Sequence, residues 1–400
     1  MAHIHFAWEL GGGLGHAGRL KPLAQEAVRR GHRVTMSLRD LVHTNALLHD
    51  VQVPRFQAPI WLHSVHGVPS PPASLAEILL TCGYLNADAL HGLVIGWQHL
   101  LGTLKPDLLV ADYAPTAMLA ARVLGIRSAA IGIGFFIPPD VSPMPCLRDW
   151  ESIQPGRLAH ADAQMLGSIN GVLQRLGGAP LQRAAQALHG DTPLALTWPE
   201  LDHYGRDRLP AGQRWWGPSM APTAGVPPVW PAGSGPRVFG YLKSTHPDHV
   251  ALLNALVQRG CRTVCYLPDV ALGAQPPVAS KLISYATGPV DLALALPDCE
   301  LCICHAGEAT LAQALILGVP VLLLPTQAEQ FLIARRVALT GAGINAAAMR
   351  RPVDYAAVIA SMVGESSYRA AARGLATRYA YYTTQQHTTD LVEEFERLLT

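Results

Sequence analysis

Short apolar runs alternate along the chain with longer amphipathic segments. Residues 3–10 carry an apolar side chain at every second position, which is typical of a strand. Residues 19–31 carry apolar side chains at helical spacing and end at Gly31, a residue that can stop a helix. Residues 32–38 read as the next strand, and similar units follow through residues 106–136. This alternation predicts strand–helix units around a parallel sheet.

The same alternation starts again at residue 237, so the chain predicts two domains in tandem. An N-terminal domain spans residues 1–213, and a second domain spans residues 237–367. Residues 214–236 between them are rich in Pro and Gly, as expected of a linker. Residues 368–400 form a helical segment that we expect to pack back toward the N-terminal domain. The predicted fold class is α/β, with two Rossmann-like doubly wound domains and a ligand cleft between them at the carboxyl ends of the strands.

Composition narrows the class of partner. Only 15% of the 400 residues are charged and the formal net charge is +1, with no run of Lys or Arg typical of nucleic-acid binding. The sequence shows no secretory leader and no run of about 20 apolar residues, so we expect a cytoplasmic protein without a transmembrane segment. The seven cysteines are an odd number, which suits reduced thiols. The sequence gives no indication of the oligomeric state.

A glycine-rich turn follows the first predicted strand. Gly13, Gly15 and Gly18 spell GxGxxG, a pattern often found at dinucleotide pockets. Such a pocket needs an acidic residue at the end of the next strand, and residues 36–37 at that place are not acidic. We therefore expect no nicotinamide or flavin cofactor. His16 lies in the same turn, where a side chain projects toward the ligand end of the sheet.

Two interpretations of His16 follow from the residues alone. Imidazole accepts a proton near neutral pH, so His16 could serve as a catalytic base. Alternatively, it caps the helix or lies half-buried without a chemical function.

The sequence around His16 resembles the UDP-sugar-dependent glycosyltransferases of the GT-B fold that act on small acceptors. That family pairs Gly-His in the first loop with Arg-Gly-His before the second strand, and here the interval from His16 to His32 fits without a gap. The chain departs from the family at Ala17, Gly18 and Arg19, where Asn-Pro is usual. The glycine run at Gly13 and Gly15 is more similar to the phosphate-facing loop of bacterial cell-wall glycosyltransferases of the same fold.

The resemblance implies a carboxylate partner for His16. Residues 106–126 match the region in which the family carries an Asp at a strand end, and Asp112 stands at that position. A carboxylate behind an imidazole fixes its tautomer and stabilises the imidazolium. The alternative for Asp112 is a cap of the following helix.

Residues 296–330 resemble the donor-binding signature of the same family. His305, Gly307 and Thr310 match its His, Gly and Ser/Thr positions, and Gly-Val-Pro and an acidic-Gln pair follow at the usual spacing. A helix that begins here would bind a diphosphate through its N-terminal N–H groups, and His305 could donate a hydrogen bond to the same diphosphate. The resemblance implies the following donor contacts: His305, Gly307, Glu308, Ala309 and Thr310 to the diphosphate, Gln313, Glu329 and Gln330 to the ribose or sugar, and Pro289 and Val290 to the nucleobase. The alternative is a tight turn that binds no ligand. Lys243 follows the first strand of the second domain, so it is either a further phosphate contact or a surface Lys beside a helix cap.

Several departures bear on the donor. The family's base-stacking Trp is absent before the strand, and Gln313 replaces a Glu that commonly binds the ribose. Ala309 and Glu308 replace an Asn and a Trp or Gly. UDP is the favoured carrier of the sugar, and dTDP is the alternative.

Cys299, Cys302, Cys304 and His305 lie close together in the sequence, but their alternation with apolar residues favours buried thiols over a metal site. No D-x-D pair suited to a metal–diphosphate complex is present, so we expect a reaction that needs no metal.

The acceptor region falls in the loops after the third and fifth strands. Trp61, Phe135 and Phe136 suggest a small apolar or aromatic acceptor that carries a hydroxyl group, although aromatic side chains also anchor loops. Taken together, the sequence predicts an inverting, metal-independent glycosyltransferase whose co-substrate is a nucleotide diphosphate sugar. The alternatives are a nucleotide-sugar epimerase of the same fold and a non-catalytic nucleotide-sugar-binding protein.

Overall fold

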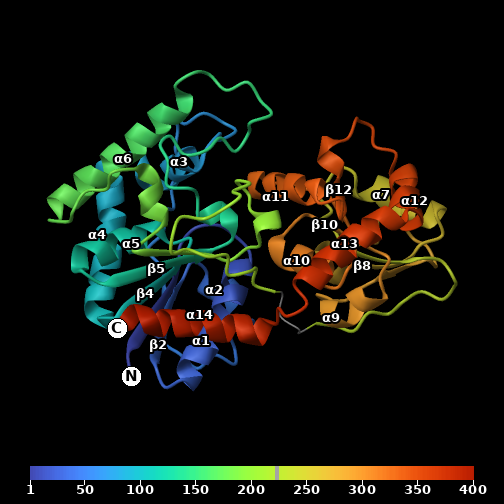
Figure 1. The fold of residues 1–400 in the computed structure, drawn as a ribbon, viewed down its shortest axis with the longest axis horizontal. Coiled ribbons are helices and arrows are strands. Elements are labelled where there is room, and N and C mark those ends of the chain that lie inside the picture. The colour runs from blue at the N-terminus through green and yellow to red at the C-terminus, as the bar shows by residue number, and fades with distance from the viewer. Residues whose placement is uncertain (221–224) are drawn as a thin grey trace. The chain divides into compact units, whose positions relative to one another are not determined.

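The computed structural model describes residues 1–220 and 225–400 and divides the chain into two compact units (Figure 1). Unit 1 comprises Met1–Gly217 and Thr383–Thr400, and unit 2 comprises Pro218–Tyr382. The predicted linker 214–236 contains the change from one unit to the other, and its residues 221–224 lie outside the described residues.

Unit 1 is built on one six-stranded parallel sheet in the order β3-β2-β1-β4-β5-β6. This is the order of a doubly wound fold, in which the chain first builds one half of the sheet and then the other. The strands are β1 (His3–Trp8), β2 (Arg33–Leu38), β3 (Arg55–Gln57), β4 (Leu108–Asp112), β5 (Arg127–Gly132) and β6 (Thr192–Ala195). The helices are α1 (Gly15–Arg29), α2 (Leu41–Thr44), α3 (Leu75–Leu79), α4 (Ala87–Leu104), α5 (Pro115–Leu124), α6 (Arg157–Arg175) and α14 (Thr384–Leu399).

Unit 2 repeats this architecture. Its parallel sheet has the order β12-β11-β10-β7-β8-β9, which is the same winding when counted from its first strand. The strands are β7 (Arg237–Tyr241), β8 (Arg262–Tyr266), β9 (Ile283–Tyr285), β10 (Leu301–Cys304), β11 (Val321–Leu323) and β12 (Gly343–Asn345). The helices are α7 (His249–Gln258), α8 (Pro268–Ala271), α9 (Leu292–Ala295), α10 (Glu308–Ile316), α11 (Ala328–Leu339), α12 (Tyr355–Gly364) and α13 (Ser366–Arg378). The predicted α/β class with two doubly wound domains is confirmed.

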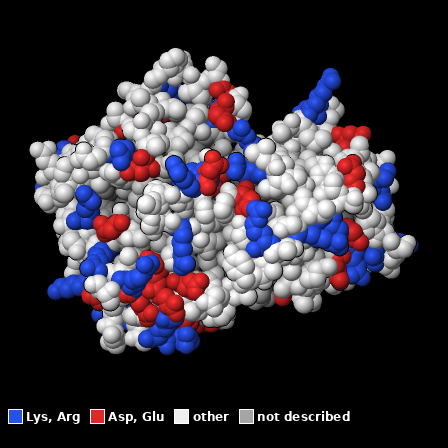
Figure 2. Space-filling model, in the orientation of Figure 1, with Lys and Arg blue, Asp and Glu red and all other residues white. Residues whose placement is uncertain are grey.

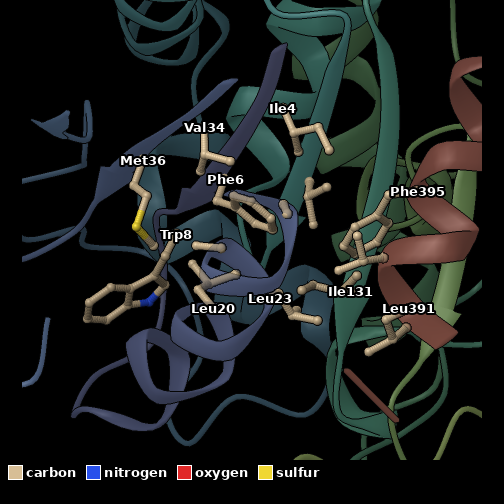
Figure 3. Close-up of a cluster of buried hydrophobic side chains, with 14 of the residues drawn as sticks. Ile4, Phe6, Trp8, Leu20, Leu23, Val34, Met36, Ile131, Leu391 and Phe395 are labelled. Atoms are coloured by element: carbon tan, nitrogen blue, oxygen red, sulfur yellow. The ribbon is translucent and has the colours of Figure 1, made fainter. Parts of the chain in front are cut away.

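The last helix of the chain belongs to the core of unit 1. Leu391 and Phe395 of α14 are fully buried against β1 and α1, and the rings of Phe6 and Phe395 lie 6.2 Å apart (Figure 3). At the edge of this contact, Arg30, the C-cap residue of α1, pairs with both Glu393 and Glu396 of α14, at 2.8 and 2.7 Å. The apolar face of α14 therefore completes the layer that α1 begins.

The segment 368–400 divides between the two units. Helix α13 packs against α10 and buries Ala372 and Leu375, so it remains in unit 2. Only α14 lies in unit 1, and the chain passes from unit 2 to unit 1 between Tyr382 and Thr383. The helical pattern at residues 368–382 did not distinguish between these two destinations.

Acidic and basic side chains are mixed over the visible face, and a dense group of both signs lies over α1 and α14 (Figure 2). Within residues 1–220 and 225–400, no single helix is long and apolar enough to cross a bilayer. The bent pair Leu75–Tyr84 and Ala87–Leu104 passes that test by length and composition when taken together.

Replacing Leu391 with Ala should destabilise unit 1. The side chain is 0% exposed in α14, and removing it leaves a cavity that lowers the free energy of unfolding by about 2–5 kcal/mol. Leu62→Ala is the matched control, because Leu62 lies in the same unit and is 79% exposed. Urea denaturation monitored by Trp fluorescence measures both variants. Equal unfolding midpoints for the two would show that α14 is not part of this core.

Candidate active site

The two central strands of unit 1 end side by side. β1 and β4 are neighbours, and their register pairs Trp8 with Asp112, the last residue of each strand. The sheet order reverses between these strands, and in open α/β sheets such a switch point is where ligands bind. The loop from β1 to α1 and the loop from β4 to α5 therefore bring their side chains together.

His16 meets Asp112 at this switch point. His16 is the second residue of α1, and its Nδ1 lies 3.0 Å from Oδ1 of Asp112. Asp112 is 0% exposed and His16 is 6% exposed. Because a buried carboxylate accepts hydrogen bonds, it selects the imidazole tautomer with a proton on Nδ1. Nε2 is then the nitrogen that can accept a proton.

Aromatic rings enclose the imidazole. Trp8 stacks on it at 5.3 Å between ring centroids, and Phe136 lies 5.4 Å away on a neighbouring loop. Tyr113 follows Asp112 in the chain and packs on Phe136 at 4.1 Å. Its φ of 49° is in the left-handed region, a conformation that non-glycine residues adopt where the surroundings impose it. These rings limit access of water to the His16–Asp112 pair.

Arg19 forms a hydrogen bond with the second carboxylate oxygen of Asp112. Its Nη1 donates to Oδ2 at 2.6 Å, and its side chain is only 10% exposed. Burial acts to raise the pKa of Asp112, but the charge of Arg19 and the contact with His16 outweigh it and hold the pKa below its ordinary value. The carboxylate is thus ionised and shared between two partners. In the sequence, Arg19 stands out only as a departure from the family pattern, although its spacing of three residues from His16 places both on one face of the helix.

Gly11 is the glycine on which the position of His16 depends. It has a φ of +78°, and a Cβ atom at this position would lie 2.5 Å from Nε2 of His16. Gly13 also has a positive φ (+80°), but a Cβ there would have no neighbour within 4 Å. Gly15 has neither constraint. The predicted glycine loop named Gly13 and Gly15, whereas the close contact with the imidazole belongs to Gly11.

Glu9 fastens the start of this loop to α5. Its buried carboxylate accepts from the backbone N–H of Thr116 at 2.9 Å and from its hydroxyl group at 2.5 Å. Burial raises the pKa of Glu9 to about 7, although the bonds to Thr116 and the charge of Arg39 act in the opposite direction. The backbone carbonyl of the same residue accepts from Arg39 at 2.8 Å.

Unit 2 has an equivalent junction between β7 and β10, the strands at its own switch point. His305 follows β10, and its Nδ1–H donates to the carbonyl of Leu324 at 2.6 Å. Its Nε2 accepts the backbone N–H of Lys243, from the loop after β7, at 2.9 Å. Burial lowers the pKa of His305 to about 4, so the ring is neutral near pH 7. The expected hydrogen bond from His305 to a diphosphate is therefore wrong for this conformation, because both ring nitrogens bond to the backbone.

The start of α10 remains open for an anion. Ala306 adopts a left-handed φ of 62°, Gly307 is exposed, and no side chain caps the helix. The first N–H groups of a helix carry a partial positive charge and suit a phosphate. Ala309 and Thr310 are half-buried in this first turn, and the side chain of Glu308 is buried. Glu308 can therefore meet a diphosphate through its backbone rather than its carboxylate.

The other predicted donor residues differ in how accessible they are. Gln313 is 8% exposed, and its Oε1 has no hydrogen-bond partner among the described residues. Gln330 lies with Glu329 in the first turn of α11, not at the strand end, and its Oε1 accepts from the backbone and hydroxyl of Thr326. Pro289 is exposed, so it can offer a face to a nucleobase.

Val290 does not fit the predicted nucleobase contact. It is 7% exposed and forms a bridge with Val226, so its side chain presents almost no surface.

Cys299, Cys302 and Cys304 are buried free thiols, as the strand pattern indicated. In the part of the chain that the structure describes, no group of three His, Cys, Asp or Glu side chains is arranged to hold a metal ion.

Comparison with known proteins gives a consistent result. Residues 285–396 match the family model of the erythromycin biosynthesis protein CIII-like C-terminal domain. The chain is 25% identical over 344 residues to a PGL/p-HBAD biosynthesis glycosyltransferase of Mycobacterium tuberculosis, covering 79% of this chain and 77% of that protein. It is 24% identical over 363 residues to the zeaxanthin glucosyltransferase of Pantoea ananas, covering 83% and 82%.

Solved structures agree with these relatives. The kitacinnamycin glycosyltransferase superposes with a TM-score of 0.72 at 18% identity, covering 100% of this chain and 99% of that one. The glycosyltransferase VinC in complex with dTDP superposes with a TM-score of 0.64 at 19% identity, covering 99% of each chain. The chain is a GT-B glycosyltransferase.

The three residues predicted to contact the acceptor of this glycosyltransferase have different surroundings in the structure. Phe136 lies beside His16, as described above. Phe135 instead faces His203 at 5.7 Å, and its carbonyl accepts from the hydroxyl of Tyr204 at 2.8 Å. Trp61 packs on the ring of His63 at 5.0 Å and over the backbone of Gly83. Phe135 and Trp61 therefore anchor their loops, and of these three residues Phe136 reaches the His16–Asp112 pair.

Gly11→Ala should disable the glycosyltransferase, whereas Gly13→Ala should not. Both substitutions place a side chain at a positive φ, but only the methyl group at Gly11 collides with Nε2 of His16. Displacing a reacting group by about 1 Å costs about 10²-fold in rate, so we expect kcat of Gly11→Ala to fall by at least that factor. We expect kcat of Gly13→Ala to stay within a few-fold of wild type. Steady-state kinetics of sugar transfer measures both variants, and equal losses would contradict this assignment.

Proposed function

We propose that the protein transfers a sugar from a nucleotide diphosphate sugar to a hydroxyl group of a small apolar or aromatic acceptor, with inversion at the anomeric carbon. The observation that carries the proposal is the buried His16–Asp112 pair at the switch point of unit 1. The glycosyltransferase relatives supply the reaction class, and the two sites described above supply residues for each step.

His16 is the proposed general base. Its Nε2 removes the proton from the acceptor hydroxyl as the oxygen attacks the anomeric carbon from the face opposite the leaving group. The bond from the anomeric carbon to the diphosphate breaks, and its electron pair leaves with the nucleotide. Asp112 keeps Nδ1 protonated and stabilises the imidazolium that forms. A single displacement of this kind inverts the configuration of the sugar.

The start of α10 is the proposed site for the departing diphosphate. Its N–H groups stabilise the negative charge that develops as the bond breaks. Thr310 adds a hydroxyl group in the same turn. His305 acts indirectly here, because it fixes the loop of Lys243 to the end of β10 through a backbone hydrogen bond.

The acceptor should be apolar around its hydroxyl group. Phe136, Tyr113 and Trp8 surround the imidazole, so a polar substituent next to the reacting oxygen would lose its hydration without a partner. The zeaxanthin glucosyltransferase, to which the chain is similar, takes its name from an acceptor that fits this description.

The nucleotide carrier is UDP or dTDP. Gln313 is the proposed ribose contact, because its buried Oε1 can accept from a ribose hydroxyl. Pro289 is the proposed nucleobase contact. VinC was solved with dTDP, which makes dTDP the carrier to test beside UDP.

His16→Ala should abolish transfer while leaving nucleotide binding intact. Losing a general base costs about 10²–10⁴-fold, so kcat should fall by at least ~10²-fold with a hydroxylated aromatic acceptor and the donor sugar that the wild type uses. His43→Ala is the control, because the His43 side chain is 82% exposed and pairs with Asp40, three residues away in the sequence. Full activity of His16→Ala with unchanged nucleotide affinity would exclude His16 as the base.

Gln313→Met should weaken nucleotide binding without weakening the fold. Met has a similar length and removes the carbonyl oxygen that lacks a described partner, so the unfolding temperature should stay the same or rise. The dissociation constant for UDP or dTDP should rise about tenfold, which corresponds to one lost hydrogen bond. Calorimetric titration with both nucleotides measures this effect.

Gln330→Met is the matched contrast, because it breaks the contacts with Thr326 and should lower the unfolding temperature. Unchanged nucleotide affinity in Gln313→Met would contradict the proposed ribose contact.

A further inference from the structure

The His16–Asp112 pair contains a third member, Arg19, that the proposed function does not use. Asp112 is fully buried, and each of its oxygens has one partner: Oδ1 lies 3.0 Å from Nδ1 of His16, and Oδ2 lies 2.6 Å from Nη1 of Arg19. Both partners come from the same face of α1, three residues apart. We refer to these three residues as the Arg19–Asp112–His16 cluster.

We infer that Arg19 is a positioning residue that holds the Asp112 carboxylate in place, keeps it ionised and opposes protonation of His16 by solvent, so that the imidazole can act as a base. The inference deepens the proposed function and rests on His16 being the base.

The charge balance of the cluster supports this inference. With a neutral imidazole, the charges of Asp112 and Arg19 cancel, and the cluster has no net charge. When His16 takes a proton from bulk solvent, the cluster gains a net positive charge in a largely buried site, which is unfavourable. Without Arg19, the same protonation would instead neutralise a buried carboxylate. Arg19 therefore opposes premature protonation of His16.

The same charge helps to complete the catalytic cycle. The imidazolium formed when the acceptor hydroxyl loses its proton lies 3.0 Å from Asp112, whose charge Arg19 partly offsets. Such an imidazolium returns its proton to water more readily than one paired with an unshared carboxylate. Arg19 also holds Oδ2, so the carboxyl plane cannot rotate away from Nδ1 of His16.

Other titratable groups lie near the cluster, and their ionisation must be distinguished from that of the cluster in a pH experiment. On α14, His387 lies near Arg19, and burial lowers its pKa to about 4 with a smaller contribution from Arg19, so it is uncharged near neutral pH. After β4, burial raises the pKa of Tyr113, which stays protonated. After β1, burial raises the pKa of Glu9 to about 7, within the range of the experiment. Arg39 bonds to the backbone of Glu9 and stays charged.

The test is the pH dependence of kcat/KM in the full-length enzyme. In Arg19→Gln, the acid limb of the profile should move to higher pH by roughly 1 unit or more, because a charge close to the carboxylate has been removed. The alkaline plateau should stay within a few-fold of wild type. Arg19→Lys restores the positive charge, so its acid limb should lie close to the wild-type position. Arg19→Met replaces Arg19→Gln if the latter fails to fold.

The Glu9→Gln variant shows how much of the acid limb comes from Glu9, whose pKa of about 7 lies within the pH range of the experiment. The inference requires that this variant keep an acid limb and that the limb stay close to its wild-type position. It is overturned if the limb disappears in Glu9→Gln, if Arg19→Gln leaves the limb in place, or if Arg19→Lys shows the same displacement as Arg19→Gln. A loss of activity at every pH with the limb unmoved would show a purely structural contribution of Arg19.

These outcomes are distinct from failure of the proposed function. If His16→Ala is inactive while Arg19→Gln keeps the wild-type limb, only the inference about Arg19 fails. If His16→Ala retains full activity, the proposed base itself fails.

Discussion

The buried carboxylate of Asp112 is the constraint on which the rest of the site depends. Its charge is acceptable in the interior only because α1 supplies two partners, His16 and Arg19, within hydrogen-bond distance. Those partners reach it because β1 and β4 end in register at the switch point, and because Gly11 leaves room for the imidazole. Helix α14 supports the same arrangement from a distance, since it closes the core beneath β1 and α1. Asp112 therefore links the strand pairing of unit 1 to the proposed chemistry of His16.

In both units a histidine lies at the junction of the first and fourth strands, but its ring nitrogens have different partners. In each, the segment after the first strand meets the end of the fourth strand, and a non-glycine residue nearby has a left-handed φ, Tyr113 in unit 1 and Ala306 in unit 2. Unit 1 uses the junction to orient an imidazole whose Nε2 can still accept a proton. Unit 2 uses both nitrogens of His305 to fasten two loops and leaves the helix start to receive an anion. The same fold thus provides a base in one unit and an anion site in the other.

The strands and the doubly wound class could be predicted from the sequence, because period-two runs and helical spacing are local patterns. The pairing of His16 with Asp112 was expected only from the resemblance of both segments to a known family. The remainder depends on distances between segments far apart in the chain. Nothing in the letters of GGGLG distinguishes Gly11, where a Cβ atom would collide with His16, from Gly13, where it would not. The match of His305 to the family signature does not reveal that both of its ring nitrogens form hydrogen bonds with the backbone. The helical pattern of α13 does not reveal which unit the helix packs in.

The tautomer of His16 in the folded enzyme shows most directly whether this imidazole can act as the base. Nitrogen-15 spectra of histidine-labelled protein, with the His16 signals identified by their absence in His16→Gln, report which ring nitrogen carries the proton. We expect a proton on Nδ1, hydrogen-bonded to Asp112, and a proton-free Nε2. A proton on Nε2, or on both nitrogens across the active pH range, would contradict the assignment of His16 as the base.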